Sequence, residues 1–399
     1  MRCETVEVAV VGGGPAGLTA AIALAAAGIE TALITKAPPE DNRTTALLSG
    51  SVAALEALGV WPLCRVHAAP LTAIRLIDDT ARLLRAPEVM FEAAEIGLDA
   101  FGYNIENRHL VAALDARASQ LPQLRRIEAA VTAVEPEDTR VMLRLEGGGA
   151  ITARLVVGAD GRKSLCRAAA GIETDHRRYP QAALTLNLGH ARPHNGVSTE
   201  FHTETGPFTL VPLPGLRSSL VCVVDPAETE GLDALDAPTL SAEIERRSHS
   251  ILGKVIVEKG RGVFPLATET AHSFARSRIA LVGEAAHVIP PIGAQGLNLG
   301  LRDAATIGEL VVGTRREGGD VGAPDLLEEY DRMRRADVTS RAFAVDALNR
   351  SLLSDFLPVQ GARGFGLYLL DRIGPLRRAV MREGVEPAAQ PRLMRGEIL

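Results

Sequence analysis

The stretch VEVAVVGGGPAGLTAAIALAAAGIETALIT, residues 6–35, decides the fold that we expect for this chain. A Val-rich run at 6–11 predicts a buried parallel strand. A glycine turn follows and opens an apolar helix that ends at Gly28, and residues 29–34 supply a second strand. Strand, glycine turn, helix and strand in this order predict an α/β domain built on a parallel sheet.

The glycines of the turn have separate roles in binding a nucleotide. Gly12 permits the tight turn, Gly14 lets a pyrophosphate approach the backbone, and Gly17 lets the helix pack close to the strand. Pro15 and Ala16 begin the helix, whose N-terminus offers unpaired N–H groups and a positive dipole end to the phosphates. In this strand–helix context GxGxxG indicates a dinucleotide site, although the motif alone suits NAD as well as FAD.

The second strand departs from the usual dinucleotide pattern. An Asp or Glu commonly ends this strand and holds a ribose diol, whereas this sequence has Thr35 and Lys36 there. A hydroxyl can still bond to the ribose, but without the charge assistance of a carboxylate. We therefore expect weaker nucleotide affinity, or compensation from elsewhere in the chain.

Composition and charge exclude several classes of protein. The chain has 399 residues and a formal net charge of -6, which argues against a nucleic-acid-binding protein that relies on general basicity. Its four cysteines are scattered, which supports neither a disulfide framework nor a zinc site, so no metal is expected and the cytoplasm is the expected compartment.

An uncharged segment near the N-terminus could be mistaken for a membrane span. No charged residue lies between Glu7 and Glu30, a length that could cross a bilayer. The glycine turn inside this segment favours the soluble strand–turn–helix interpretation. Glu4 and Glu7 also stand where a signal peptide would have basic residues.

Two further motifs select the nucleotide. Residues 153–167, ARLVVGADGRKSLCR, place Asp160 and Gly161 directly after an apolar strand. Residues 278–303, RIALVGEAAHVIPPIGAQGLNLGLRD, place Gly283 and Glu284 after another strand, followed by a Pro/Gly loop and a helix.

The three motifs together resemble the class A flavoprotein monooxygenases, the family of p-hydroxybenzoate hydroxylase, over nearly the whole chain. Four stretches are similar in particular to the bacterial ubiquinone-biosynthesis hydroxylases. These stretches are DNRTTAL at 41–47, GYNIENRHLVAAL at 102–114, TGPFTLVPLPG at 205–215 and GAQGLNLGLRD at 293–303.

The resemblance implies a role in FAD binding for particular residues. Glu284 would hold the ribityl chain, with one methylene more than the usual Asp, and the loop from Pro290 to Asn298 would face the pyrimidine end of the flavin, where a helix dipole stabilises negative charge. The remaining cofactor contacts that it implies are Arg43, Asn107, Arg108, Val131 (on an expected strand from Arg126 to Val134), Asp160, Gly161, Gly283, Pro291, Gly293, Gln295, Gly296 and Leu297.

Several of these residues have an alternative structural role. Arg43 could be a surface arginine, and Arg108 could pair with Glu106 and never contact FAD. His287 could be a packed, hydrogen-bonded histidine rather than a catalytic base. The Pro291 carbonyl is a candidate catalytic contact by resemblance alone, and no general base for a phenol can be named. Ser164 and Arg167 could cap and complement a helix.

The expected architecture is α/β: a Rossmann-type FAD-binding domain with an inserted antiparallel-sheet substrate domain and C-terminal helices. The FAD-binding domain would comprise residues 1–70, 98–175 and 270–345. The substrate domain would comprise 71–97 and 176–269, where short Thr/Val/Leu-rich runs lie between Gly and Pro residues. A C-terminal helical region would follow at 346–399.

Residues 360–383 combine apolar positions with five arginines. Such a helix can lie on an anionic membrane, which would place the protein peripherally on the inner face of that membrane. Alternatively, it forms part of a helix pair docked on the FAD-binding domain. Both descriptions hold if one face docks while the other remains free for lipid or a partner, such as a ubiquinone-biosynthesis complex.

The resemblance implies that NAD(P)H reduces FAD, that O₂ forms a C4a-hydroperoxide, and that an electron-rich aromatic ring takes the distal oxygen. The first hypothesis is hydroxylation of a hydrophobic, polyprenylated phenol in ubiquinone synthesis. The alternatives are a hydroxylase of a small soluble aromatic and a FAD-binding subunit with little catalysis of its own. Tryptophan-type halogenation is disfavoured, since Trp61 is the sole tryptophan.

Overall fold

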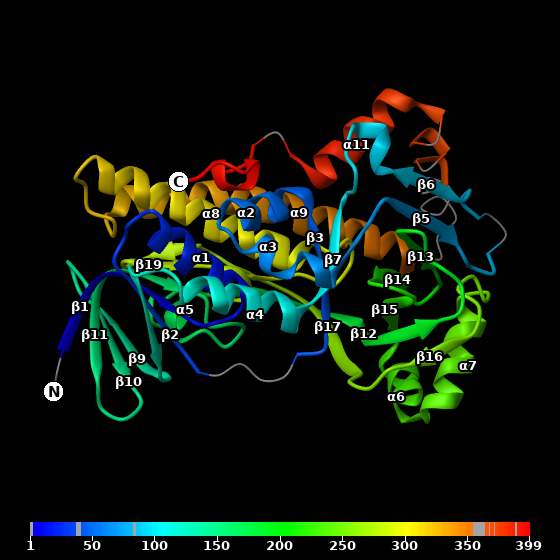
Figure 1. The fold of residues 1–399 in the computed structure, drawn as a ribbon, viewed down its shortest axis with the longest axis horizontal. Coiled ribbons are helices and arrows are strands. Elements are labelled where there is room, and N and C mark those ends of the chain that lie inside the picture. The colour runs from blue at the N-terminus through cyan, green and yellow to red at the C-terminus, as the bar shows by residue number, and fades with distance from the viewer. Residues whose placement is uncertain are drawn as a thin grey trace.

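The computed structural model describes residues 3–36, 41–82, 85–353, 364–366, 368–370, 372–387 and 389–399. Within them, two large sheets lie side by side and long helices pass across both (Figure 1). No helix in these ranges is long and apolar enough to cross a membrane.

The first sheet has eight strands and a parallel centre in the order β19-β11-β1-β2-β8. Val8, Ala9 and Val10 are completely buried, because helices cover both faces of a parallel sheet and its strands need no polar side. The strands are β1 (Cys3–Val11), β2 (Thr31–Thr35), β8 (Leu124–Glu128), β9 (Val131–Pro136), β10 (Val141–Leu145), β11 (Ala150–Gly158), β18 (Ala275–Arg276) and β19 (Ile279–Leu281).

This sheet confirms the α/β class and the predicted strand, glycine turn, helix and strand order. One expected strand was wrong. The segment from Arg126 to Val134 is not a single strand, because β8 pairs with β2 and β9 pairs with β10. The chain must turn at Ala129 and Ala130 to change partners, and hydrophobic periodicity carries no information about such a change.

The second sheet has nine strands, antiparallel except where β13 runs parallel to β5. Residues 71–97 contribute two of them. The strands are β5 (Ala73–Asp78), β6 (Val89–Glu92), β12 (Thr174–His190), β13 (Val197–His202), β14 (Pro207–Leu213), β15 (Arg217–Val224), β16 (Val255–Val257), β17 (Gly262–Ala271) and β20 (His287–Val288).

The two faces of the second sheet have different neighbours. On β15, Leu220, Cys222 and Val224 pack with α6 (Pro226–Ala234) and α7 (Ala237–Arg247). Side chains alternate along a strand, so Arg217 and Ser219 point to the opposite face, where they bond to Glu106 and Asn104.

A three-stranded sheet, β3 (Thr44–Leu48), β7 (Gly102–Glu106) and β4 (Ala68–Pro70), connects the two large sheets. Asn104 of β7 donates from Nδ2 to the Pro212 carbonyl at 2.9 Å and to Ser219 Oγ at 3.1 Å. Asn104 is buried, so these bonds satisfy a polar group that would otherwise be costly and fix the small sheet to the large one.

The helices around the first sheet include the two longest described ones, α8 and α9, which run along the top of Figure 1. Besides α6 and α7, the described helices are α1 (Pro15–Ala26), α2 (Ser49–Ala57), α3 (Trp61–Cys64), α4 (Asn107–Ala118), α5 (Leu165–Ala169), α8 (Gln295–Arg316), α9 (Pro324–Leu353) and α11 (Gly374–Val385), with 3₁₀ turns η1 (Arg65–His67), η2 (Ala93–Ile96), η3 (Gly283–Ala285) and η4 (Arg392–Arg395).

Candidate FAD site

The glycine turn after β1 leaves no room for side chains on its inner side. Gly12 has φ +112°, and a Cβ there would lie 2.1 Å from the Ala159 carbonyl oxygen. A Cβ on Gly17 would lie 2.2 Å from the Gly12 carbonyl oxygen. Both glycines are therefore required by close backbone contacts, which bring the first motif against the residue that precedes Asp160 in the second.

The outer side of the same turn is open. A Cβ at Gly14 would meet no atom within 4 Å. Gly14 is the N-cap of α1, Pro15 is in its first turn, and no side chain caps the helix. The first-turn N–H groups therefore remain available to a ligand, and a pyrophosphate could reach the backbone. This open cradle fits the diphosphate of FAD.

Thr35 lies beside this turn, but its hydroxyl has a local partner. Its Oγ1 donates to the Lys36 carbonyl at 2.8 Å, and a Cβ on Gly13 would lie 2.3 Å from Oγ1. Lys36 forms an exposed ion pair with Glu146 at 2.7 Å. No carboxylate at the end of β2 itself thus faces the turn.

Asp160 acts as a helix-capping residue. Its Oδ1 accepts from Ser164 Oγ at 2.6 Å, and its Oδ2 accepts from the Cys166 N–H at 3.1 Å. Ser164 in turn caps α5, which is the structural alternative considered for it. Gly161 has φ +79° and a Cβ there would meet no atom within 4 Å, so its backbone offers the open surface of this motif.

The third motif packs directly on the first. Cβ atoms built on Gly283 and Gly300 would lie 3.3 and 3.2 Å from the Cβ of Ala16. Glu284 follows Gly283, and its carboxylate is half exposed and bonds to Arg162 at 3.2 Å. The acidic residue assigned to the ribityl chain is therefore held at the surface of the site, close to the start of α1.

His287 belongs to a buried charge cluster rather than to an open site. It is 2 % exposed, and its Nε2 lies 2.7 Å from Oδ2 of the fully buried Asp303. Asp303 also accepts from the Gly283 N–H at 2.9 Å and from Arg334 Nε at 2.6 Å. This geometry favours the packed-histidine alternative over a catalytic role for His287. Sequence inspection missed the partnership of Asp303 with Arg334.

Burial and charge act in opposite directions on Asp303. Burial favours the neutral acid, but the charges of His287 and Arg334 and the hydrogen bonds outweigh it, so the pKa of Asp303 is lowered. The cluster therefore carries an ionised carboxylate that anchors the Gly283 N–H.

The loop before α8 exposes backbone toward the same region. Gly293 has φ +68° and Ala294, the N-cap, has φ +53°, a conformation uncommon for a residue with a side chain. Pro291, Gly293 and Gly296 are exposed. No side chain caps α8, so its first-turn N–H groups can face negative charge on a reduced flavin.

Asn298 fixes this helix start to β3 and α2. Its Nδ2 donates to the carbonyls of Ala46 and Ala294 at 2.8 and 2.6 Å. Its Oδ1 accepts from the Leu48 N–H at 2.9 Å and from Ser51 Oγ at 2.6 Å. These four bonds use the full hydrogen-bonding capacity of the amide, so the Asn298 side chain has no donor or acceptor left for a ligand. Asn298 therefore shapes the site. Gln295 bonds to the Gly293 carbonyl at 3.0 Å, and Leu297 packs on the core.

Arg43 is held in place by Asp41. Its Nε and Nη2 each donate to that carboxylate at 2.8 Å, and its guanidinium lies 5.4 Å from the ring centre of Phe264. Asp41 and Glu284 both raise the pKa of Arg43. Nearly half of the Arg43 side chain is exposed, and its contact with the cofactor stays a prediction.

Asn107 supports Asp41 from the start of α4. Its Nδ2 donates to Asp41 Oδ2 at 2.9 Å, and its Oδ1 accepts from Thr45 Oγ1 at 2.6 Å. Burial raises the pKa of Asp41, but the hydrogen bonds from Arg43 and Asn107 lower it by more, so the net shift is downward. Asn107 thus acts on Arg43 through Asp41.

Arg108 forms the ion pair with Glu106 that was considered as its alternative, at 2.8 Å. Glu106 is buried and also accepts from Arg217 at 3.3 Å. Burial raises the pKa of Glu106, but both arginines lower it, with a net downward shift. Arg217 in addition pairs with Glu258 at 2.7 Å. The bonds of Arg217, which the sequence did not indicate, join β7 to the second sheet.

Val131 begins β9 and packs, partly buried, against the main core. Its backbone pairs with Leu145 of β10. Nothing in this geometry assigns its side chain to an adenine ring, and the contact stays a prediction. The described residues contain no group of three or more potential metal ligands.

The face of the second sheet opposite α6 and α7 carries a row of four side chains, three of which are polar. Strand register aligns Thr185, Val221, Thr209 and Glu200 across four neighbouring strands. Glu200 accepts from Thr209 at 3.3 Å and bonds to the buried His202 at 2.7 Å. A substrate ring between this row and the flavin would meet hydroxyl and carboxylate groups.

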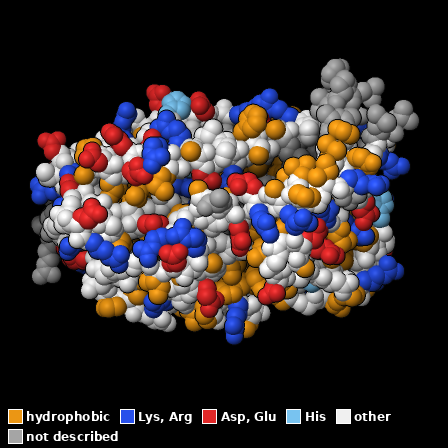
Figure 2. Space-filling model, turned by 90° about the horizontal axis from the view of Figure 1, so that it is seen from above, with side chains coloured by type: hydrophobic (Ala, Val, Ile, Leu, Met, Phe, Trp, Pro, Cys, Tyr) orange, Lys and Arg blue, Asp and Glu red, His pale blue; other side chains and the backbone are white. Residues whose placement is uncertain are grey.

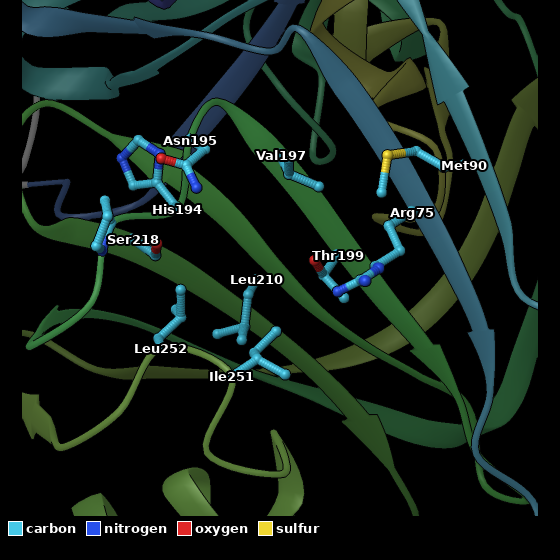
Figure 3. Close-up of a pocket in the computed structure, with 11 residues that line it drawn as sticks. Arg75, Met90, His194, Asn195, Val197, Thr199, Leu210, Ser218, Ile251 and Leu252 are labelled. Atoms are coloured by element: carbon cyan, nitrogen blue, oxygen red, sulfur yellow. The ribbon is translucent and has the colours of Figure 1, made fainter.

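A cavity of about 260 Å³ lies on the other face of the same sheet. Leu210, Ile251 and Leu252 form its apolar side, with His194 at one end and Arg75 at the other (Figure 3). Leu210 belongs to the core formed with α6 and α7, so the sheet lies between this cavity and the face that contacts Asn42 and Glu106. We therefore do not place the aromatic ring of a substrate there.

Comparison with known proteins adds to this geometry. Residues 5–343 match the FAD binding domain family. The chain is similar to ubiquinone hydroxylase UbiL of Rhodospirillum rubrum, with 38% identity over 98% of this chain and 93% of the relative. It is also similar to the 3-demethoxyubiquinol 3-hydroxylase of Escherichia coli, with 31% identity over 96% and 99% of the two chains. The fold resembles that of p-nitrophenol 4-monooxygenase PnpA from Pseudomonas putida, with a TM-score of 0.79, 21% identity and coverage of 97% and 100%.

Proposed function

Because this chain belongs to the FAD-binding family of flavoprotein monooxygenases, we propose that it hydroxylates the ring of a polyprenylated phenol in ubiquinone biosynthesis. FAD is the cofactor, NAD(P)H the co-substrate and O₂ the oxidant. The observation that carries the proposal is similarity over nearly the whole chain, the second sheet included, to a ubiquinone hydroxylase and a 3-demethoxyubiquinol 3-hydroxylase. FAD, when bound, would supply the redox chemistry by which two electrons from NAD(P)H and one O₂ give a ring hydroxyl and one water.

The residues of this chain bind and orient. The open backbone at Gly14 and the start of α1 would hold the diphosphate, and Glu284 would hold the ribityl hydroxyls. The uncapped start of α8 would stabilise negative charge at the pyrimidine end. The row that includes Thr209 and Glu200 would face the aromatic ring. Substrate burial between sheet and flavin would exclude water from the reacting atoms.

The test is NAD(P)H oxidation by the purified holoenzyme with and without a prenylated phenol, with ¹⁸O₂ and mass spectrometry of the product. We expect stimulated oxidation and one ¹⁸O atom on the ring. Stimulation by hydrophilic phenols alone would favour a hydroxylase of small aromatics. Full FAD loading without turnover of any phenol would favour the alternative that the chain is a FAD-binding subunit with little catalysis of its own.

We further propose that the C-terminal helices contact a membrane surface. On α11, Met381 and Val385 face inward and pack with η2 and Phe101, and Arg377 bonds to Glu95 at 2.7 Å. The helix therefore docks on the segment at 71–97 and also on Phe101, which lies in the expected FAD-binding domain.

The outer face of this region carries exposed apolar and cationic side chains among the described residues. Figure 2 shows hydrophobic side chains gathered on this side of the molecule, with Lys and Arg around them. The exposed apolar residues are Phe365, Tyr368, Ile373, Leu376 and Val380, and the exposed arginines are Arg372, Arg378 and Arg382. Residues 360–363, 367 and 371 of the predicted helix lie outside the described residues. Apolar and cationic groups on one face suit an anionic lipid surface.

Flotation with anionic and neutral vesicles tests this contact. Leu376→Asp with Val380→Asp should abolish flotation with anionic vesicles, because both side chains are more than 40 % exposed and their loss should not affect packing. Ile256→Asp is the matched control, because Ile256 is an exposed apolar residue on β16, away from α11. Unchanged flotation of the double variant would exclude this face as the membrane contact and leave it to a partner enzyme.

A further inference from the structure

The end of β2 lacks the usual carboxylate, but the adjacent strand β8 carries one beside that position. β2 and β8 are parallel, and their register pairs Thr35 with Glu128. Paired residues on adjacent strands project their side chains to the same face, with strands about 4.8 Å apart. A carboxylate on β8 therefore lies one strand away from the position where a dinucleotide site usually has its own.

The direction of Thr35 shows which way Glu128 faces. The Thr35 hydroxyl lies against the glycine turn, since a Cβ on Gly13 would come within 2.3 Å of its Oγ1. On the same face of β8, Arg126 bonds to Asp115 of α4 at 2.6 Å. Glu128 thus projects to the side of the sheet that carries α4 and the start of α1, at the carboxyl end of its strand.

Glu128 is also chemically available. Its side chain is 78% exposed, and among the described residues its only ion pair within 4.0 Å is a loose one with Arg126 at 3.9 Å. Arg126 already has a closer partner in Asp115. Glu146, the other carboxylate near this end, pairs with Lys36 at 2.7 Å. Among these carboxylates Glu128 can accept hydrogen bonds from a ligand without breaking a close ion pair.

We propose that Glu128 binds the adenosine ribose hydroxyls of FAD, and that this contact replaces the carboxylate that β2 lacks. A carboxylate accepts charge-assisted hydrogen bonds from a ribose diol, which a threonine hydroxyl cannot match. The assignment depends on FAD binding and is independent of the proposed phenolic substrate.

The test measures the dissociation constants of FAD and FMN for Glu128→Gln by quenching of flavin fluorescence. FMN lacks the adenosine half, so it reports the flavin and ribityl contacts alone. We expect FAD binding to weaken about tenfold, the usual effect of losing a hydrogen bond to a charged group, with FMN binding unchanged. Glu146→Gln, which removes a nearby carboxylate of the same size, should alter neither constant.

A second variant restores the missing group at its usual place. Thr35→Glu in the Glu128→Gln background should recover most of the FAD affinity, because the new carboxylate lies on the adjacent strand and can reach the same diol. Thermal unfolding of each apoprotein should match the wild type, since Glu128 is exposed. The proposal is overturned if Glu128→Gln leaves FAD binding unchanged, or if it weakens FMN binding equally. Failure of phenol turnover alone would leave it intact.

Discussion

Replacement of Asp303 is expected to destabilise the whole protein and to weaken FAD binding. Asp303 is completely buried and bonds to the Gly283 N–H, His287 Nε2 and Arg334 Nε at 2.9, 2.7 and 2.6 Å. Arg334 is 3 % exposed and would keep only its bond to Asp337. Removal of one partner of a buried ion pair costs about 3–5 kcal/mol, because the other charge stays buried without compensation. We expect Asp303→Asn to lose free energy of unfolding in this range.

The assay is urea unfolding of the apoprotein, with Asp325→Asn as the control because Asp325 is an exposed carboxylate in the first turn of α9. The pH dependence has a definite sign. The pKa of Asp303 is lowered in the folded state, so its contribution is complete above the unfolded value of about 3.9 and is lost as the pH falls through the folded value. The difference between wild type and variant should therefore shrink on acidification.

A double variant tests the cause. If the uncompensated charge of Arg334 is responsible, Asp303→Leu with Arg334→Met should be more stable than Asp303→Leu alone. The FAD dissociation constant should rise in every Asp303 variant, because the Gly283 N–H loses its anchor next to Glu284. A loss below about 1 kcal/mol for Asp303→Asn, typical of an exposed ion pair, would refute this reasoning.

Four other substitutions have outcomes that the geometry separates. Gly14→Ala should leave thermal stability unchanged, because φ at Gly14 is -70°, yet raise the FAD dissociation constant at least about tenfold, because the new methyl group would fill space open to a phosphate. Gly12→Ala should fail to fold stably, since its Cβ would lie 2.1 Å from a carbonyl oxygen. Equal behaviour of the two variants would contradict the assignment of the diphosphate to the open side of the turn. Asn298→Ala should lower the free energy of unfolding by about 1–3 kcal/mol in urea, because the Leu48 N–H would lose its buried partner, and a neutral result would argue against that bond. Glu284→Ala should weaken both FAD and FMN binding while stability changes by less than about 1 kcal/mol, as its ion pair is half exposed; retained flavin affinity would remove Glu284 from the site.

The glycine turn, the α/β class and the strand before each motif could be predicted because their causes are local. Positive φ at Gly12, a helix start at Pro15 and a buried Val-rich strand follow from neighbouring residues alone. The capping role of Ser164 and the Arg108–Glu106 pair were foreseen as alternatives for the same reason, since their partners lie within a few residues.

The tertiary structure decided the contacts between residues distant in sequence. Asp303 meets Arg334 only because α9 packs beside α8, and Thr35 meets Glu128 only through the register of two parallel strands. The break between β8 and β9 has the same origin, because a change of partner strand leaves no local pattern. The sequence by itself determined that a nucleotide turn exists and that the β2 carboxylate is absent. Only the packing of strands and helices determined which carboxylates surround that turn, since hydrogen-bond register and burial depend on the whole fold.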